Sequence, residues 1–520
     1  MGVVQSTVWR RFSPAANRQV GRLSHQRLSH QGGRTRSRRD GGLVLITVLV
    51  VIGLIAISAA SLLYRVNAEV IAASTTQGGE QAAAAAYSGL QRTITLLQQY
   101  RDDPDMWHDN PELFRDQLVM EDGNERWYYT VYSPPADENT LGEDSRLRFG
   151  VTDTSSRLNL NTVSEASLLA LPDMTPELVD ALLDYRDADD EPRPQGAEQE
   201  YYRELERPYW IKNGPFTTVE ELLLVRGFTP GLLFGAEAST HRDDEKDGEG
   251  YTIGRTPLVR LLTTVSQEPD VDAQGVARVD LNGNISRLAS LGLSQATLNF
   301  IRIYRAENNT FVHPSDLLGM EYTVRETVEE DGQGPRPGQQ PGRGRGRRGG
   351  RRGGGGSDNP PRQAGQVIRC QPTDEDLVIL MDRTTTRHAQ RRQSLLGRVN
   401  VNTAPFEVLA AVEGMDADLA DSIISIRSGL DPQARATLAW LWTEGVVDEA
   451  TFRTIAPRLT TRSYQFHVRV LGYGLPSGRY RVYEAIVDLA GDRPRVVYLR
   501  DRTRLGLPMP IAGDGVSALN

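Results

Sequence analysis

The densest group of metal-binding side chains in this sequence lies in one short acidic loop. The loop holds the carboxylates of Asp187, Asp189, Asp190 and Glu191, and Glu198 follows shortly after it. Oxygen-rich loops suit calcium, which takes about six to eight oxygen ligands. The spacing is not that of an EF-hand, and the central glycine of that motif is missing. A solvated acidic loop is therefore the simpler interpretation, and a calcium site formed by these five residues is the alternative.

Three hairpins between neighbouring predicted helices could bring backbone amides to a phosphate. They span residues 172–175, 291–294 and 413–416. DNA-binding helix-hairpin-helix units use a Gly-x-Gly hairpin, because their N–H groups must approach the phosphate closely. None of these hairpins has both glycines, and two carry Asp173 or Asp416 where the phosphate would lie. We therefore expect the hairpins to serve packing or protein binding rather than nucleic acid.

Patterns typical of enzymes are missing from the sequence. The seven histidines show no metal-ligand spacing, and there is no phosphate-binding Gly-Lys-Ser/Thr motif or Gly-x-Ser-x-Gly elbow. The one cysteine, Cys370, cannot form an intrachain disulfide framework. The sequence thus predicts a protein that is not an enzyme.

An internal repeat must position the acidic loop and the hairpins. Leu-Asn-Leu-Asn-Thr at 158–162 is matched by Val-Asn-Val-Asn-Thr at 399–403, and a weaker copy begins with Val-Asp-Leu-Asn. Each copy predicts an extended entry, a helix, a tight turn and a second helix. Thr162 and Thr403 are the expected N-caps of the first helices. The three copies lie near 158–230, 279–320 and 399–428.

A long apolar segment precedes the repeats. The 22 residues from Leu43 to Tyr64 carry no charge, which is enough helix to cross a bilayer core of about 30 Å. Residues 1–42 hold nine arginines and one acid, so this leader is +8 and the remainder is −17. The positive-inside rule places the leader in the cytoplasm and the acidic bulk across the membrane. That acidic bulk argues against general nucleic-acid binding.

Strand-like segments flank the repeats and indicate one sheet that carries a helical insertion. They lie at 127–153 and 464–500 and alternate in the manner of antiparallel strands. The segment 331–366 is rich in Arg and Gly and should be disordered. The predicted domains are a cytoplasmic leader (1–42), an N-terminal helix (43–105), a first part of the sheet (106–153), an inserted helical domain (154–460), the last strands (461–503) and a tail (504–520).

Three segments resemble the minor pseudopilin K family of bacterial type II secretion systems. The first is the basic leader that ends in Gly42 before the apolar helix, which is similar to a type IV prepilin signal. The second runs from Leu158-Asn-Leu-Asn-Thr through Tyr185 and the acidic loop to Pro215-Phe216. The third is Val399-Asn-Val-Asn-Thr-Ala-Pro405 with the strands behind it. The resemblance implies an α+β, type IV pilin-like fold, with a long N-terminal transmembrane helix, an antiparallel sheet and an inserted all-α domain of helix-hairpin-helix-like repeats.

The resemblance also implies how the chain would be processed and where it would act. Prepilin peptidase would cleave between Gly42 and Leu43 and N-methylate Leu43. Anchored by a single pass in the inner membrane with its bulk in the periplasm, the protein would then join the tip of the pseudopilus. There it would initiate or cap assembly with the minor pseudopilins I and J. The family also binds calcium, but the resemblance transfers no ligand residue by residue.

Position 47 supports a place at the tip. Most pilins carry Glu at the fifth mature position, where it pairs with a neighbour's terminal amine, and here that position is Thr47. An unpaired buried carboxylate costs several kcal/mol, so a subunit with no neighbour above it is better without one. Two further functions fit parts of the chain: a membrane-anchored helix-hairpin-helix DNA receptor, and the tip subunit of a type IV pilus. The long leader, the middle repeat and the Arg/Gly-rich segment are departures from the family.

Overall fold

The computed structural model describes residues 41–133, 147–235, 256–324, 365–387 and 394–511. Most of the leader and of the Arg/Gly-rich segment lies outside these ranges, so the predictions made for them stay predictions. The chain divides into two compact units, residues 1–74 and residues 75–520. The described part of the first unit is helical throughout, and all strands belong to the second unit.

Helix α1 (Gly41–Tyr100) is continuous through both units. Among the described residues, it holds the one stretch long and apolar enough to cross a membrane, with a mean hydropathy of 2.7. Its side chains from Leu45 to Ile71 are almost all exposed. In the second unit the same helix buries Ala82, Ala86, Leu90 and Leu97. The apolar segment at the start of the helix is apolar on all faces, which suits contact with lipid. The second half buries apolar residues on one face only, which suits packing on a domain.

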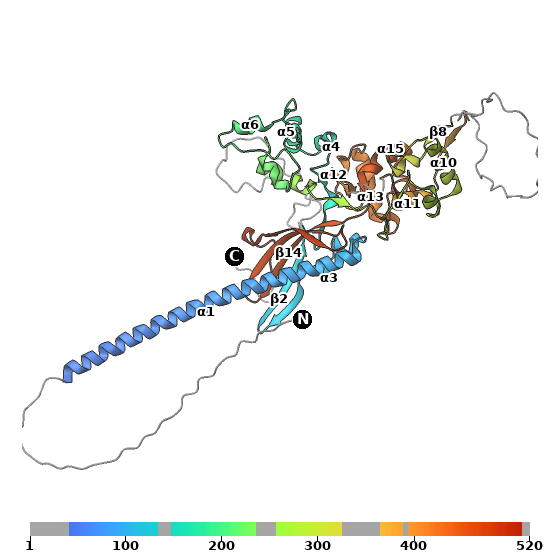
Figure 1. Ribbon diagram of the computed structural model, residues 1–520. Coiled ribbons are helices and arrows are strands. Elements are labelled where there is room, and N and C mark those ends of the chain that lie inside the picture. The colour runs from blue at the N-terminus through green and yellow to red at the C-terminus, as the bar shows by residue number, and fades with distance from the viewer. Residues whose placement is uncertain (1–40, 134–146, 236–255, 325–364, 388–393, 512–520) are drawn as a thin grey trace, which may run out of the picture. The chain divides into compact units, whose positions relative to one another are not determined.

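A six-stranded antiparallel sheet packs against the second half of α1 (Figure 1). Its order is β1-β2-β14-β15-β16, and β3 pairs with the start of β14. The core between helix and sheet includes Trp107, Val131 and Phe466. Two segments far apart in the sequence therefore build one sheet. The strands are β1 (Gln117–Asp122), β2 (Glu125–Tyr132), β3 (Thr152–Asp153), β14 (Gln465–Leu475), β15 (Tyr480–Asp488) and β16 (Arg495–Asp501).

Everything between β3 and β14 forms the insert, and three copies of one unit recur in it. Each copy has a two-residue entry strand, a short helix and a longer second helix. The first copy is β4 (Leu158–Asn159), α4 (Glu165–Leu169) and α5 (Pro176–Arg186); the middle copy is β7 (Val279–Asp280), α9 (Ile285–Ala289) and α10 (Gln295–Ala306); the last copy is β12 (Val399–Asn400), α12 (Phe406–Ala410) and α13 (Ala417–Gly429).

The insert is not purely helical, which corrects the expectation of an all-α domain. Each entry strand pairs in parallel with a short strand from later in the chain: β5 (Leu262–Thr263), β10 (Thr384–Thr385) and β13 (Leu459–Thr460). Four further short strands pair antiparallel: β6 (Gln267–Glu268) with β11 (Leu395–Leu396), and β8 (Glu321–Thr323) with β9 (Val367–Arg369). Two-residue ladders carry no apolar alternation, so the sequence pattern could not reveal them. The α+β class itself is confirmed.

The remaining α-helices are short. They are α2 (Pro104–Trp107), α3 (Pro111–Phe114), α6 (Gln199–Arg203), α7 (Pro230–Phe234), α8 (Leu258–Leu261), α11 (Asp374–Arg383), α14 (Trp440–Thr443) and α15 (Glu449–Ile455). Four of them (α6, α7, α8 and α11) lie between the copies. The predicted N-caps are wrong by two residues. Helix α4 is capped by Ser164, whose hydroxyl accepts from Ser167 N, and α12 begins after Pro405.

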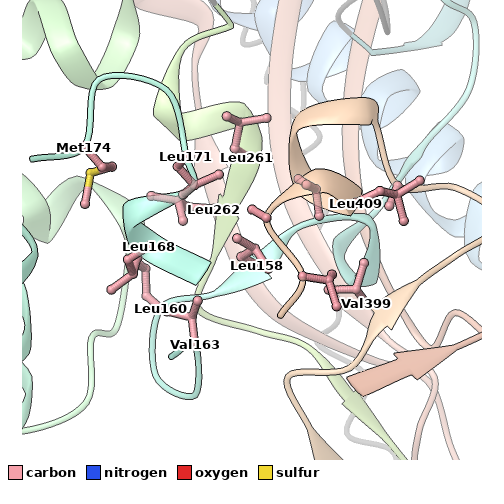
Figure 2. Packing of buried hydrophobic residues seen from close by; sticks show 14 of the residues in the cluster. Leu158, Leu160, Val163, Leu168, Leu171, Met174, Leu261, Leu262, Val399 and Leu409 are labelled. Carbon is pink, nitrogen blue, oxygen red and sulfur yellow. The ribbon is translucent and has the colours of Figure 1, made fainter. Parts of the chain in front are cut away.

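The copies are held together by two apolar cores. The first and last copies share one core, in which Leu158 and Leu168 lie in the same cluster as Val399 and Leu409 (Figure 2). The middle copy has a separate core with α11, built from residues such as Leu298, Phe311 and Leu380. The first and last copies therefore form one body, although more than 200 residues separate them in the sequence.

Candidate functional site

The acidic loop lies between α5 and α6, and α5 itself fixes its course. Asp184, in the last turn of α5, is completely buried, and its carboxylate accepts from the backbone N–H of Arg193 at 3.2 Å. Asp180, one turn earlier, accepts from the N–H of Gln195 at 3.0 Å. A Cβ at Gly196 would clash with Asp184 Oδ2, so the loop can pass this close to the helix only with glycine there.

Three of the five predicted calcium residues converge in this loop. Asp187, Asp189 and Glu198 can each place one carboxylate oxygen within 4.8 Å of the others. Glu198 is only 5 % exposed, and neither of its oxygens has a hydrogen-bond partner among the described residues. Asp187 Oδ1 is likewise buried without a partner. Buried carboxylate oxygens without donors are costly, and a cation would satisfy them. These oxygens suit a calcium ion in chemistry and spacing, and the three side chains would supply part of its six to eight ligands.

The other two predicted residues play different parts. Asp190 accepts from the amide of Asn213 at 2.9 Å. The Glu191 side chain is exposed, and its N–H donates to Asp189 at 3.0 Å. Neither residue belongs to the converging group.

Asn213 is a site residue that the sequence did not indicate. Its Nδ2 donates to Asp189 O at 3.1 Å and to Asp190 Oδ1 at 2.9 Å, while its Oδ1 is buried without a partner among the described residues. Its φ of 41° is left-handed, a conformation that asparagine tolerates better than most residues. The turn composition Lys-Asn-Gly-Pro was the available signal, but nothing in it points to a loop more than 20 residues away.

Burial and mutual repulsion shape the electrostatics of the group. Burial, followed by the charges of Asp184, Asp187, Asp190 and Asp189, raises the pKa of Glu198 to about 7. Burial and the charge of Asp189 also raise the pKa of Asp187. The carboxylates therefore resist ionising together, which a divalent cation between them would reverse.

The amides of the repeated asparagines bind backbone groups within the insert. In the first copy Asn161 donates to Phe216 O at 3.0 Å and accepts from Phe216 N at 2.7 Å. In the middle copy Asn282 makes the same pair of bonds with Phe311, both at 2.9 Å. In the last copy Asn402 donates to Arg435 O at 2.9 Å. Each amide thus closes the unit against a later part of the chain.

The hairpins also use their polar groups internally. Asp173, Gly292 and Gly414 occupy equivalent turn positions with left-handed φ of 60°, 90° and 94°. The N-termini of the helices that follow are capped by the side chains of Thr175, Ser294 and Asp416. The donors that a phosphate would need are therefore partly satisfied within the chain, in agreement with a packing role.

The residues predicted for processing lie at the start of α1. Gly42 and Leu43 fall in its first turn, and Thr47 is exposed in the same helix. No feature of the described residues tests cleavage, methylation or the role of Thr47, and these stay predictions.

Comparison with known proteins finds a family match for the first part of the insert. Residues 156–234, which contain the first copy and the acidic loop, match the family model of type II secretion system protein K. A chain in the crystal structure of the GspK-GspI-GspJ complex from the enterotoxigenic Escherichia coli type 2 secretion system is also similar, with 11 % identity and a TM-score of 0.39 over 82 % of this chain and 98 % of that one. No curated protein matches the sequence. The family-model match confirms the resemblance read from the sequence: residues 156–234 are similar to type II secretion system protein K.

Proposed function

We propose that this protein is the minor pseudopilin at the tip of a type II secretion pseudopilus, where it initiates or caps assembly for protein export across the outer membrane. The observation that carries the proposal is the position of the protein K segment. It lies in an insert between two strands of a sheet that packs on a long N-terminal helix, the first half of which is apolar enough to span a membrane. The protein would act as a structural component and not as an enzyme.

The helix suits an element that leaves the bilayer for a fibre. Its exposed apolar first half can contact lipid, and it can later contact the same kind of helix in neighbouring subunits. We propose that prepilin peptidase cleaves between Gly42 and Leu43 and methylates Leu43. The single span then lies in the inner membrane, with residues 75–520 in the periplasm.

The insert and Thr47 both favour the tip. The insert comprises most of residues 154–464, far more than a pilin sheet needs, and its bulk would hinder the stacking of a further subunit above it. A subunit with no neighbour above it has no amine to pair with an acid at position 47. The family resemblance gives the minor pseudopilins I and J as partners.

We further propose that calcium binds at Asp187, Asp189 and Glu198, with the side-chain oxygen of Asn213 as a fourth candidate ligand. When bound, the ion would supply positive charge to these carboxylates. Asp184, Asp180 and Gly196 hold the loop on α5, so the ion would tie α5, the loop and α6 together. Its role is therefore structural.

Mass spectrometry of the protein purified from cells with active prepilin peptidase tests the processing. The mature chain should begin with N-methylated Leu43, and a Gly42→Leu variant should keep its leader. Recovery of uncleaved wild-type protein from those cells would remove the pseudopilin assignment. Cleavage with assembly into a surface pilus would instead support the type IV pilus alternative. The DNA-receptor alternative requires salt-sensitive binding of duplex DNA, and nothing in the geometry of the hairpins favours it.

A further inference from the structure

A basic cavity of about 310 Å³ lies where the insert meets the sheet domain. Its walls come from the segments around α2 and β3 and from α8, α12 and α13. Five arginines line it, against two acids, Asp105 and Asp153. The excess of positive charge in this cavity is notable because the protein as a whole carries −9. The arginines are Arg148, Arg157, Arg260, Arg427 and Arg435.

The two acids do little to neutralise these arginines. Asp153 is buried and bonded to neutral donors: Ser155 N at 2.8 Å, Asn400 Nδ2 at 2.9 Å and Thr403 Oγ1 at 2.7 Å. Asp105 is 71 % exposed and pairs at 3.3 Å with Arg435. Among the described residues, no carboxylate forms an ion pair with Arg148, Arg157 or Arg427. Asp109 and Asp153 act on Arg148 and Arg157 through their charges alone, and burial outweighs them.

The bonds of these three arginines are to neutral groups or absent. Arg148 donates to His108 O at 2.9 Å, to His108 Nδ1 and to Thr152 Oγ1 at 3.1 Å, and its Nε is buried without a partner. Arg427 donates to Val401 O at 2.7 Å. The guanidinium of Arg157 makes no hydrogen bond or ion pair with any other part of the described chain. Guanidinium donors are thus available on more than one wall of the cavity.

Grouping these charges is unfavourable without an anion. Burial lowers the pKa of Arg148, Arg157 and Arg427 to about 10 in each case. Neighbouring arginines add to the effect at Arg157 and Arg427. Each guanidinium remains charged at neutral pH, so the cavity holds several cations that repel one another. A bound anion would remove that repulsion.

We propose that this cavity binds a small multivalent oxyanion, either phosphate or a compact di- or tricarboxylate. Arginine forks match the planar oxygens of carboxylates and the oxygens of phosphate. Leu261, Pro405 and Phe406 provide an apolar wall that suits a short carbon skeleton. Since the walls belong to both the sheet domain and the insert, the anion would fasten one to the other. This site is separate from the acidic loop and does not depend on the proposed function.

Isothermal titration calorimetry on the detergent-solubilised full-length protein tests the site. Inorganic phosphate and citrate are titrated separately into chloride buffer, which distinguishes phosphate from carboxylate as the preferred chemistry. We expect saturable 1:1 binding of at least one of them. Arg157→Gln and Arg148→Gln should each weaken it at least about tenfold, the loss expected when a charged hydrogen bond is removed.

Two further variants separate a specific site from general charge and from misfolding. Arg287→Gln removes the same charge at an exposed position on α9, outside the cavity, and should keep the affinity within about twofold. Arg157→Lys keeps the charge without the fork and should bind with intermediate affinity, and its circular dichroism should match the wild type. The proposal is overturned if neither anion binds at millimolar concentration, or if Arg157→Gln and Arg148→Gln bind as well as Arg287→Gln.

Discussion

At the scale of single residues, the chemistry of this protein depends on charges that are buried without matching partners. Glu198 and Asp187 hold buried carboxylate oxygens that no donor satisfies, and Arg148 and Arg157 line the basic cavity without an ion pair to any described carboxylate. Isolated buried charge is expensive, so such groups mark ligand sites more often than they stabilise a fold. The acidic group lies in the insert, and the basic group lies where the insert meets the sheet domain.

Calcium should stabilise the protein through Glu198. At about 100 times its dissociation constant, a ligand adds about 2.7 kcal/mol to folding, so added calcium should raise the melting temperature by several degrees. Glu198→Gln should lose most of that gain, because the neutral amide supplies no anionic oxygen. Glu200→Gln, at an exposed position two residues later, should keep it. Thermal unfolding with calcium and with chelator measures the difference. Equal responses of the two variants would show that the loop is merely solvated.

His108 should make the protein less stable in acid. Burial, with Arg148 and Arg427 nearby, lowers its pKa from the ordinary 6.5 to about 3. Between these values the unfolded chain binds a proton that the folded chain does not. Stability is therefore full above pH 6.5 and falls as the pH decreases, by at most about 2 kcal/mol at pH 5. His108→Gln should remove that share of the pH dependence in urea unfolding at pH 7.5 and pH 5. An unchanged pH dependence would mean that His108 titrates normally.

At the scale of elements, one unit is used three times and closed each time by an asparagine amide. Asn161 and Asn282 each exchange two hydrogen bonds with the backbone of a phenylalanine, Phe216 or Phe311. The second helix of each copy adds an arginine that donates to carbonyls of the entry segment: Arg186 to Leu160, Arg305 to Asn282 and Arg427 to Val401. These polar contacts explain why the Asn-containing segments recur in the sequence.

Replacing Asn282 should therefore destabilise the middle copy. Asn282→Asp loses the donor to Phe311 O and places a negative charge against that carbonyl, which should cost about 1–3 kcal/mol. Asn284→Asp is the matched control, because Asn284 caps α9 as an acceptor and aspartate caps equally well. Denaturant unfolding should show the loss in the first variant and a change within about 0.5 kcal/mol in the second. A similar effect of both would refute the closing role of the amide.

The packing of helix α1 on the sheet should depend on the absence of a side chain at Gly472. A Cβ there would clash with Ala82 O and Ala86 N, so α1 can lie on β14 only because the strand has no side chain at that point. Gly472→Ala should cost about 1–3 kcal/mol through forced separation of helix and strand. A Cβ at Gly491 would meet only Arg493 O, at 3.9 Å, so Gly491→Ala should change stability little. If Gly472→Ala unfolds at the same denaturant concentration as the wild type, the close packing of α1 on β14 is wrong.

Sequence patterns predicted the elements that have a long apolar run, a sustained alternation or a repeated motif. The apolar residues from Leu43 to Tyr64, the alternation in β14 and β15 and the two Asn-Thr openings all correspond to elements of the structure. The patterns could not predict two-residue ladders such as β4 with β5, which depend on contacts about 100 residues apart. They also missed Asn213 and the basic cavity. In both cases the residues are scattered along the chain and meet only in the folded protein.

At the scale of the whole molecule, a pilin-like helix and sheet carry a large insert with a protein K segment. In the proposed function, the helix would enter a fibre and the bulk of the insert would end it. A tip subunit acts only in a complex, because it must bind the subunits below it. The account therefore predicts a specific complex with other minor pseudopilins.

Co-expression of the full-length protein with the minor pseudopilins I and J of the same secretion system tests this central claim most directly. After detergent extraction and affinity purification through this protein, the three chains should elute together in a 1:1:1 complex on size-exclusion chromatography. A major pseudopilin co-expressed in their place should not form that complex. Recovery of the protein alone, with I and J well expressed in the same extract, would contradict the account.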